Sequence, residues 1–566
     1  MEAIGFKNFR RFEKLEPLQL GGVNFFVGGN NSGKSTVVKA MMLLMDNMED
    51  LRPMHIGSRI TSSIPSFRFD ANHIHNVHIG TFGRALHKPY PEVKEIVLEG
   101  QHRHFHFSYT IVGDEKATSA NAHVKKIEFT DLRDKVRYVF DFEIDEFSVF
   151  YNKLVLKKYA VKSGVDVFER LRGMGTPLLA EDIDSSDIEL YEQLKAEEAA
   201  LNESLKTLSN PIQIAQINSR LNLVKKQLDM LGHAQKSFKD EELTYKASLK
   251  QVTFSRDYIS SQLDEQWRQY KDHGLSTRNL RERKEVIEFY QKLSSEDKAF
   301  LIMLSSIGKE WRRYDRFEIE YIPAHVAAQK VLFSIEDKND YMGQVIRDFM
   351  GQKITRGSYE YSFIQKWMNR FEIGIDFEIQ PIEGEAYTMN VTKGDYQMPL
   401  ADFGMGSIQI ILLLLRLATI ISKNVFFDRI GNVGATKETL VIIEEPEQNL
   451  HPKFQSMLAD LFAYVNKEFG FRFVIETHSE YLIRRTQAMI ATGKDITGNE
   501  ITFENNPFRV YYFPEKGQPY DMEYQESGRF VQSFGHGFFD ESAKHTMDIS
   551  LNEQKKVINE DINWGN

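Results

Sequence analysis

Three runs of mainly apolar residues, each followed by glycine or polar residues, stand out in the hydrophobic pattern of the chain. They lie at 23–27, 440–443 and 473–475. Short apolar runs bounded by turn residues are typical of strands that are buried on both faces of a parallel sheet. The first run leads into the glycine-containing segment 28–35 and then into the helix-like segment 36–44. This order predicts a βα unit that feeds a sheet.

A second pattern, alternation of apolar and polar residues, dominates the chain from about 66 to 161. Examples are the runs 93–98 and 105–112. Such alternation is typical of strands with one buried face. We also expect a strand over 3–12 and another over 18–27 that leads into the turn. The predicted fold class is α/β, with a mixed sheet that carries the turn and an antiparallel β lobe beside it.

The pattern changes again near Glu181. From there to residue 317 the chain is charged and poor in glycine and proline, and apolar residues recur at four-then-three spacing on both sides of Pro211. This favours an inserted helical or coiled-coil hairpin, and two amphipathic helices lying on a globular core are the alternative. The predicted parts are 1–180 with the turn and the β lobe, 181–317 as the insertion, 318–540 as the second part of the core, and 541–566 as a tail.

Composition narrows the class of protein. With 566 residues the chain is too long for one core, and 42% hydrophobic residues are typical of a globular protein. The absence of cysteine excludes disulfides and cysteine-ligated zinc. We find no apolar stretch near the roughly 20 residues that span a bilayer, so we expect a cytoplasmic protein without membrane contact. A net charge of −10 argues against nucleic acid binding by the whole surface, although a local basic patch stays compatible with it.

The turn at 28–35 reads Gly-Gly-Asn-Asn-Ser-Gly-Lys-Ser, the pattern of a phosphate-binding loop. At a strand-to-helix junction, such a loop surrounds a polyphosphate with backbone N–H groups. Lys34 would reach the β- and γ-phosphates of ATP, and the Ser35 hydroxyl would ligate Mg²⁺. An ordinary glycine turn before a core helix is the alternative. The predicted nucleotide-binding residues are Gly28, Asn30, Asn31, Ser32, Gly33, Lys34, Ser35 and Thr36.

Polar residues follow the other two apolar runs. Glu444 and Glu445 end the run at 440–443, where a parallel sheet places its ligands. Beside a Mg²⁺-nucleotide, Glu444 can hold the metal, and Glu445 can take the proton from an attacking water. His478 follows the run at 473–475. It could hydrogen-bond a γ-phosphate, or it could cap the next helix.

A further anion-binding pattern precedes the very apolar segment 410–415. Gly404, Gly406 and Ser407 form a Gly-x-Gly-Ser sequence at the start of a predicted helix. One protomer needs only one such anion-binding loop for its own phosphates. A second anion-binding sequence therefore implies a second protomer.

The order of these motifs resembles that of the ATP-binding-cassette ATPases of the RecF, SMC and OLD type. The resemblance covers about 1–60 and 318–540, and the string Glu-Glu-Pro-Glu…Leu-His-Pro at 444–452 is rather specific to the OLD-like branch. In that family two heads enclose two ATP molecules. The resemblance implies that Ser407 contacts the γ-phosphate in trans, that Glu445 is the catalytic base and that His478 is the switch histidine.

The sequence departs from that family in two places. The residue before the catalytic glutamate is commonly aspartate, whereas Glu444 stands here, which puts direct metal contact in doubt. The glutamine that usually follows the first lobe cannot be placed, so part of the Mg²⁺ shell stays unassigned.

No acidic cluster of the Toprim nuclease type is visible in the roughly ninety residues after His478. The chain therefore resembles the ATPase subunits of phage-defence systems such as Septu, its retron-associated relatives and PARIS. The resemblance implies a homodimer or higher even oligomer that controls a separately encoded effector, a nuclease or toxin. The alternatives are an ATPase that acts on DNA in repair, as RecF and SMC proteins do, and a structural coiled-coil protein with a vestigial nucleotide site.

Histidines and basic residues form two further groups of candidate binding side chains. Three histidines alternate at 102, 104 and 106, downstream of three more between 73 and 78. They predict either a metal site or, more simply, a polar sheet face. Basic clusters lie at 7–11, 278–284 and 309–313. They are solvated faces or contacts to nucleic acid phosphates, and both interpretations stay open.

Overall fold

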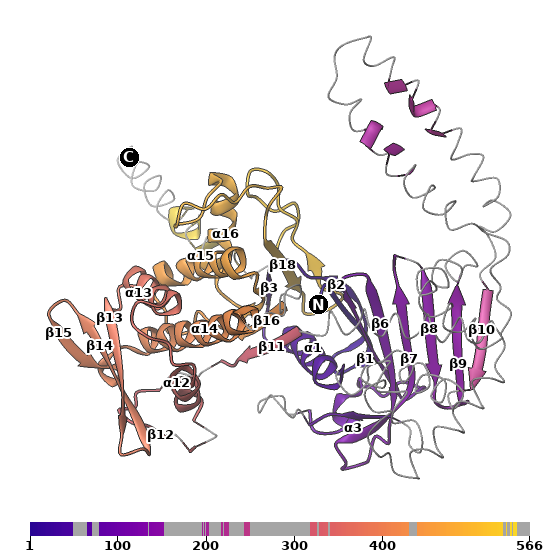
Figure 1. Ribbon diagram of the computed structural model, residues 1–566, viewed down its shortest axis with the longest axis horizontal. Coiled ribbons are helices and arrows are strands. Elements are labelled where there is room, and N and C mark those ends of the chain that lie inside the picture. Colours follow the sequence, from indigo (N-terminus) through magenta and orange to yellow (C-terminus); the bar gives the residue numbers. More distant parts are fainter. Residues whose placement is uncertain are drawn as a thin grey trace, which may run out of the picture.

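The structure is a computed structural model. It describes residues 1–48, 65–70, 79–151 except 134, 243–248, 317–429 except 325–327, 335 and 338–339, and 438–535, together with short pieces between 195 and 225 and between 539 and 551. In these parts the chain forms three sheets, with helices packed around them (Figure 1).

The central sheet carries the phosphate-loop pattern. Its strands, in order across the sheet, are β11 (Phe317–Ile322), β16 (Glu438–Glu444), β17 (Arg472–Thr477), β3 (Val23–Gly28), β18 (Phe508–Phe513) and β19 (Tyr520–Asp521). The first five are parallel, and β19 is antiparallel to β18. Because the carboxyl ends of parallel strands share one edge, the ends of β3, β16 and β17 lie together.

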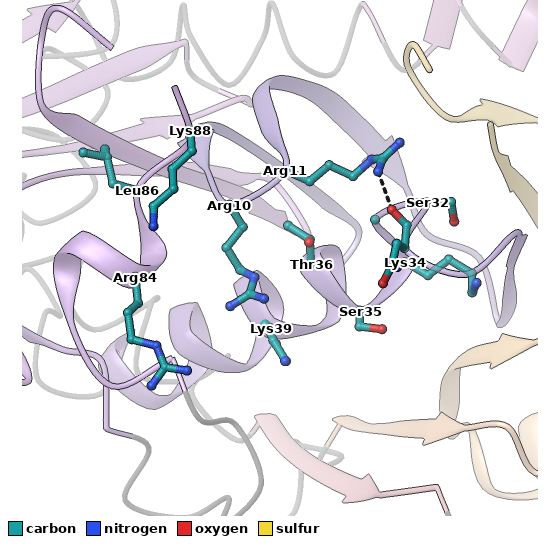
Figure 2. A pocket seen from close by; sticks show the side chains of 12 residues that line it. Arg10, Arg11, Ser32, Lys34, Ser35, Thr36, Lys39, Arg84, Leu86 and Lys88 are labelled. Carbon is teal, nitrogen blue, oxygen red and sulfur yellow. Dashed lines mark hydrogen bonds between the residues drawn. The ribbon is translucent and has the colours of Figure 1, made fainter. Parts of the chain in front are cut away.

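The second sheet is antiparallel and forms the β lobe. Among the described residues its order is β10 (Leu243–Ser248), β9 (Glu146–Tyr151), β8 (Val136–Asp141), β7 (Asn121–Asp131), β6 (Phe105–Val112), β5 (Glu95–His102), β1 (Ala3–Phe9) and β2 (Phe12–Gln19), with β4 (Ser66–Arg68) beside β7. The strands alternate buried and half-exposed positions, most regularly in β5 and β6. The tight turn between β1 and β2 brings Arg10 and Arg11 beside the segment that contains Lys34, Thr36 and Lys39 (Figure 2).

Helix α1 (Lys34–Met48) lies between the two sheets. It contacts β1 and β4 of the lobe and β3 and β17 of the central sheet, and its apolar residues belong to one core with both. A second core covers the other face of the central sheet. It is built by α12 (Tyr341–Gly351), α13 (Tyr359–Arg370), α14 (Met405–Arg429), α15 (Pro452–Phe469) and α16 (Glu480–Thr492), with a small sheet of β12 (Phe333–Ser334), β13 (Asp376–Ile382), β14 (Ala386–Lys393) and β15 (Tyr396–Pro399).

The predicted fold class is confirmed, and so is the βα unit. The predicted single strand over 18–27 is wrong, because the segment is divided between β2 in the lobe and β3 in the central sheet. The buried Asn24 side chain explains the break. Its Oδ1 accepts the Gly21 N–H at 2.7 Å and its Nδ2 donates to the Phe473 carbonyl at 2.8 Å, which fixes a turn before β3.

The insertion predicted at 181–317 lies largely outside the described residues. Short helical pieces are present between 195 and 225, and one strand, β10, lies within the range and extends the β lobe antiparallel to β9. Most of the predicted helical hairpin and the tail at 541–566 are therefore not described. The boundaries of the four predicted parts stay predictions.

Helix α14 contains a stretch, Met405–Asn424, that is long and apolar enough to cross a membrane by length and composition. The expectation that no stretch approaches this length is therefore wrong. Of that window, 78% is buried inside the protein, as in the core helix of a globular domain. Among the described residues, no other helix meets the same criteria.

Candidate functional site

The loop at 28–35 joins the end of β3 to the start of α1. Two of its glycines are required by close contacts. A Cβ at Gly33, whose φ is +109°, would lie 2.5 Å from ring carbons of Phe12, and a Cβ at Gly28 would lie 2.4 Å from the Phe513 carbonyl oxygen. The loop is thus clamped between the β1–β2 turn and the end of β18.

Lys34 is buried at the first position of α1. Its ammonium donates to the carbonyl oxygens of Gly28, at 2.9 Å, and Gly29, at 3.0 Å. Burial lowers the pKa of Lys34, and the carboxylates of Glu476, Glu445 and Glu447 act in the opposite direction. The charged side chain is therefore held against the loop, between its carbonyls and an acidic sheet edge.

A cavity of about 460 Å³ opens beside the loop and the start of α1 (Figure 2). Six cationic side chains line it: Arg10, Arg11, Lys34, Lys39, Arg84 and Lys88. Burial lowers the pKa of Arg10, with Arg84 adding to the effect, and burial and Arg10 together lower the pKa of Lys39. Cations that depress each other's pKa at a hollow surface favour an anionic ligand.

The carboxylates gather at the edge where β16 and β17 end. Glu444 on β16 is paired in register with Glu476 on β17. The Ser35 hydroxyl donates to Glu476 Oε2 at 2.8 Å, and the Glu445 N–H donates to the Glu476 carbonyl at 2.8 Å. The predicted metal-binding hydroxyl therefore contacts Glu476, a residue to which the sequence analysis assigned no role.

Glu476 is only 4% exposed. Burial, and next Glu444, raise the pKa of Glu476 to about 8, against the opposing effect of the Ser35 hydrogen bond. Its Oε1 atom has no hydrogen-bond partner. The sequence does show Glu476 as an acidic residue within a mainly apolar strand. Its role can be inferred only when the strands beside β17 are known.

Glu445 lies just beyond β16. Its carboxylate accepts a hydrogen bond from Gln448, and His478 Nε2 lies 3.9 Å from Glu445 Oε1. The His478 N–H donates to Glu447 Oε1 at 2.7 Å. Burial, followed by the charge of Lys34, lowers the pKa of His478 against the opposing effect of Glu445, and the lower pKa favours the neutral ring. The base and the histidine that the sequence predicts are thus neighbours.

Gly404, Gly406 and Ser407 stand at the start of α14. The Ser407 N–H donates to the Gly404 carbonyl at 2.9 Å, and Gly406 packs so closely that a Cβ there would lie 2.5 Å from the Asn449 carbonyl oxygen. These residues do not line the cavity at the loop. The structure therefore joins the loop to the carboxylate edge through Ser35 and Glu476. Glu444, Glu445 and His478 lie at that edge, and like the Gly-x-Gly-Ser residues they do not line the cavity itself.

The donors near Ser35 fit Mg²⁺, which takes one or two carboxylates together with phosphate oxygens and water. Ser35 and Glu444, with the adjacent Glu476, supply oxygen donors at one place. Within the described residues, no group of three or more His, Cys, Asp or Glu side chains could hold a metal by itself. Any metal here would accordingly need oxygens from its nucleotide.

The alternative histidine site finds no support in the part of the chain that is described. His102 is buried 3.8 Å from Glu438, and His106 lies 3.7 Å from Glu99. The upstream histidines at 73, 75 and 78 fall outside the described residues, as do the basic clusters at 278–284 and 309–313. Of the first basic cluster, Arg10 and Arg11 line the cavity.

Comparison with known proteins gives one family. The model of the AAA ATPase domain matches residues 1–483. No curated protein matches the chain significantly. Two solved structures share 9% identity and a TM-score of 0.28 with it: an Smc head domain with an extended coiled coil, bound to the C-terminal domain of ScpA, from Pyrococcus furiosus, and an SMC head domain from Thermotoga maritima. The matches cover 92% and 93% of this chain and 96% and 98% of those chains.

Proposed function

Because the chain belongs to the AAA ATPase domain family, we propose that it binds ATP with Mg²⁺ at the loop 28–35 and hydrolyses it. One observation carries this proposal. Lys34 and Ser35 stand between a cavity lined by cations and a sheet edge lined by carboxylates. The cations of the cavity would bind the phosphates of ATP. The carboxylates of the sheet edge would bind the metal and activate the attacking water.

The cationic side of the site suits a triphosphate. The backbone N–H groups of the loop and the N-terminus of α1 would face the phosphates, as in other phosphate loops. Arg11 donates to the Asn31 carbonyl of the loop, so one guanidinium is already joined to the cradle. Arg10 and Lys39 are half-buried at the same hollow, where charge-assisted bonds to phosphate are strong.

The acidic side suits hydrolysis. Glu445, oriented by Gln448, would accept the proton of the attacking water, and the neutral His478 beside it would donate a hydrogen bond to the γ-phosphate. Ser35 and Glu444 would hold Mg²⁺. When bound, the ion neutralises charge that develops on the phosphate oxygens.

The active unit is proposed to be a homodimer or a higher even oligomer. Gly404, Gly406 and Ser407 begin a helix but do not line the cavity of their own chain. A second copy could present this helix N-terminus to the γ-phosphate, as the motif order implies. ATP would then favour the closed pair of heads, and hydrolysis would remove that preference.

At the level of biology, we propose that ATP-dependent pairing of the heads controls a separately encoded effector with nuclease or toxin activity in phage defence. The resemblance of the motif order supports this proposal, and the slow, regulatory ATPase that it implies suits a switch. An ATPase acting directly on DNA in repair is the alternative. Co-purification with the product of a neighbouring gene would favour defence, whereas salt-dependent DNA binding by the protein alone would favour repair.

The ATPase proposal is tested first by binding. Calorimetry should show binding of Mg²⁺-ATP to the wild-type protein, and phosphate release should be measurable. Lys34→Ala removes the ammonium that the loop carbonyls hold in place, and affinity should fall about tenfold or more. Wild-type affinity in the Lys34→Ala protein would contradict the assignment of the site.

A further inference from the structure

We propose that Glu476 is the carboxylate that binds the Mg²⁺ ion directly, together with Ser35, and that Glu444 supports the ion from the neighbouring strand. The inference rests on the proposed nucleotide site and adds a ligand to it. Ser35 contacts Glu476 directly. The Ser35 hydroxyl donates to Glu476 Oε2 at 2.8 Å, and no hydrogen bond joins it to Glu444 in the described structure.

One carboxylate oxygen of Glu476 is unsatisfied. Glu476 is 4% exposed, yet its Oε1 atom accepts no hydrogen bond. A buried carboxylate oxygen without a partner is costly and uncommon. A cation adjacent to Ser35 would satisfy this oxygen, and the same cation is what the phosphate loop requires.

Two acidic residues are paired on adjacent strands at this place. Glu444 and Glu476 are partners in the register of β16 and β17, and neighbouring strands lie about 4.8 Å apart. Residues paired in this way point to the same face of the sheet. Lys34, the nearest loop cation, donates to the Gly28 and Gly29 carbonyls instead of to either acid. A divalent ion can neutralise both carboxylates at once.

The surroundings divide the roles of the two acids. Glu444 is half-buried and interacts with the hydroxyl of Tyr321 on β11, on the side away from β17. Glu476 faces Ser35 on α1. The acid that contacts the hydroxyl ligand is therefore Glu476.

The test compares two isosteric variants, Glu476→Gln and Glu444→Gln. Mn²⁺ serves as the probe, and the free ion is measured by electron paramagnetic resonance with a non-hydrolysable ATP analogue present. We expect Glu476→Gln to weaken Mn²⁺ binding about tenfold or more, and Glu444→Gln to weaken it less. A glutamine can still accept the Ser35 hydrogen bond, so a purely positioning role for Glu476 predicts unchanged Mn²⁺ affinity. That result would overturn the proposal, as would a larger loss in Glu444→Gln.

A second measurement keeps the outcome interpretable. In EDTA, Glu476→Gln should bind a fluorescent ATP analogue at least as tightly as wild type, because without the metal the substitution adds no negative charge and removes no contact to the triphosphate. This result would show that the variant is folded. If the wild-type protein bound no nucleotide under any condition, the proposed function would fail. If it bound nucleotide normally but Glu476→Gln kept its Mn²⁺ affinity, only the present inference would fail.

Discussion

Glu445 owes its orientation to backbone geometry as much as to its side chain. Its φ is +45°, in the left-handed region that non-glycine residues rarely adopt. The N–H bond to the Glu476 carbonyl holds this conformation, and Gln448 donates to the carboxylate. Strain of about 1–3 kcal/mol at one residue persists only where the surroundings fix it, and such positions cluster at functional sites.

Glu445→Gln should therefore separate binding from chemistry. The amide keeps the shape of the side chain but cannot accept the proton of water, so turnover should fall about 100-fold or more. Affinity for ATP should stay within about threefold of wild type, because the phosphates contact the loop. Phosphate release and calorimetry measure the two quantities. The matched control is Glu468→Gln on the exposed surface of α15, which should keep wild-type turnover and wild-type affinity for ATP. Unchanged hydrolysis in Glu445→Gln would disprove the assignment of Glu445 as the base.

His102 gives a residue-scale prediction for stability. It lies at the end of β5, where the β lobe meets the start of β16, and burial is the main cause that lowers its pKa to about 4. The charged groups that act on it are the amino group of Met1, Glu438, Arg103 and Arg472. Below the ordinary pKa of about 6.5, the unfolded chain takes up a proton that the folded protein does not. Stability should therefore fall by up to about 1.4 kcal/mol for each pH unit between about 6.5 and 4.

The measurement is the melting temperature at several pH values between 7.5 and 5. Other groups titrate in the same window, so the informative quantity is the difference between wild type and His102→Asn, in which this histidine is absent. The variant should have the shallower dependence on pH. If the melting temperatures of the two proteins changed with pH in the same way, His102 would be protonated equally in the folded and unfolded states.

The positions of residues within a local motif could be predicted from the sequence, whereas contacts between segments far apart in the sequence could not. The loop residues, Glu445 and His478 follow directly after apolar runs, and the structure places them at one edge. Glu476 was left without a role because its contact with Ser35 spans 441 positions of sequence. Arg84 and Lys88 join the cavity in the same way, from a segment whose sequence gives no sign of phosphate binding.

At the scale of elements, the loop depends on the β1–β2 turn. A Cβ at Gly33 would lie 2.5 Å from ring carbons of Phe12, whereas a Cβ at Gly29 would have no heavy atom within 4 Å. Gly33→Ala should therefore displace the loop and weaken ATP binding about tenfold or more, and Gly29→Ala should change it little. Calorimetry with Mg²⁺-ATP compares the two variants. Equal losses would show that the contact with Phe12 does not set the geometry of the loop.

The strands predicted from the sequence are correct where the apolar pattern is local and wrong where pairing between distant segments decides. Strands such as β3 and β16 contain a short, mainly apolar run that is buried, so the pattern identifies them without knowledge of the fold. The division of 18–27 depends on Asn24, whose side chain bonds to Gly21 and to Phe473, a residue of another strand. A polar residue inside an apolar run has this meaning only when its partners are known. β10 was missed because its pairing with β9 joins segments nearly one hundred residues apart.

For the whole molecule, the relevant feature is that Gly404, Gly406 and Ser407 do not line the cavity at the loop of their own chain. The loop, Glu445 and His478 share one edge of the central sheet, and Gln409 near the start of α14 donates to the Pro446 carbonyl of the same chain. The start of α14 is thus fixed to the turn that follows Glu445, but Ser407 does not line the cavity. In a symmetric pair, each cavity would have to receive Ser407 from the other copy.

This arrangement predicts complementation between inactive variants. Lys34→Ala should inactivate the site that contains its own loop, and Ser407→Arg should inactivate the site on the partner, so each homodimer should have no intact site. A mixed dimer should contain one intact site, formed by the loop of the Ser407→Arg chain and Ser407 of the Lys34→Ala chain. With random mixing, half of the dimers are mixed, so about a quarter of wild-type ATP hydrolysis should return. Phosphate release from the mixture, compared with the sum of the separate proteins, measures this.

The control mixture combines Lys34→Ala with Glu445→Gln. Both residues belong to the same chain's site, since Glu445 bonds to Glu476 and Glu476 to Ser35. No mixed dimer would then contain an intact site, and activity should not return. Recovery in this control would show that Glu445 acts in trans. Failure of Lys34→Ala and Ser407→Arg to complement, with both proteins folded and exchanging subunits, would mean that the ATP site is complete within one chain.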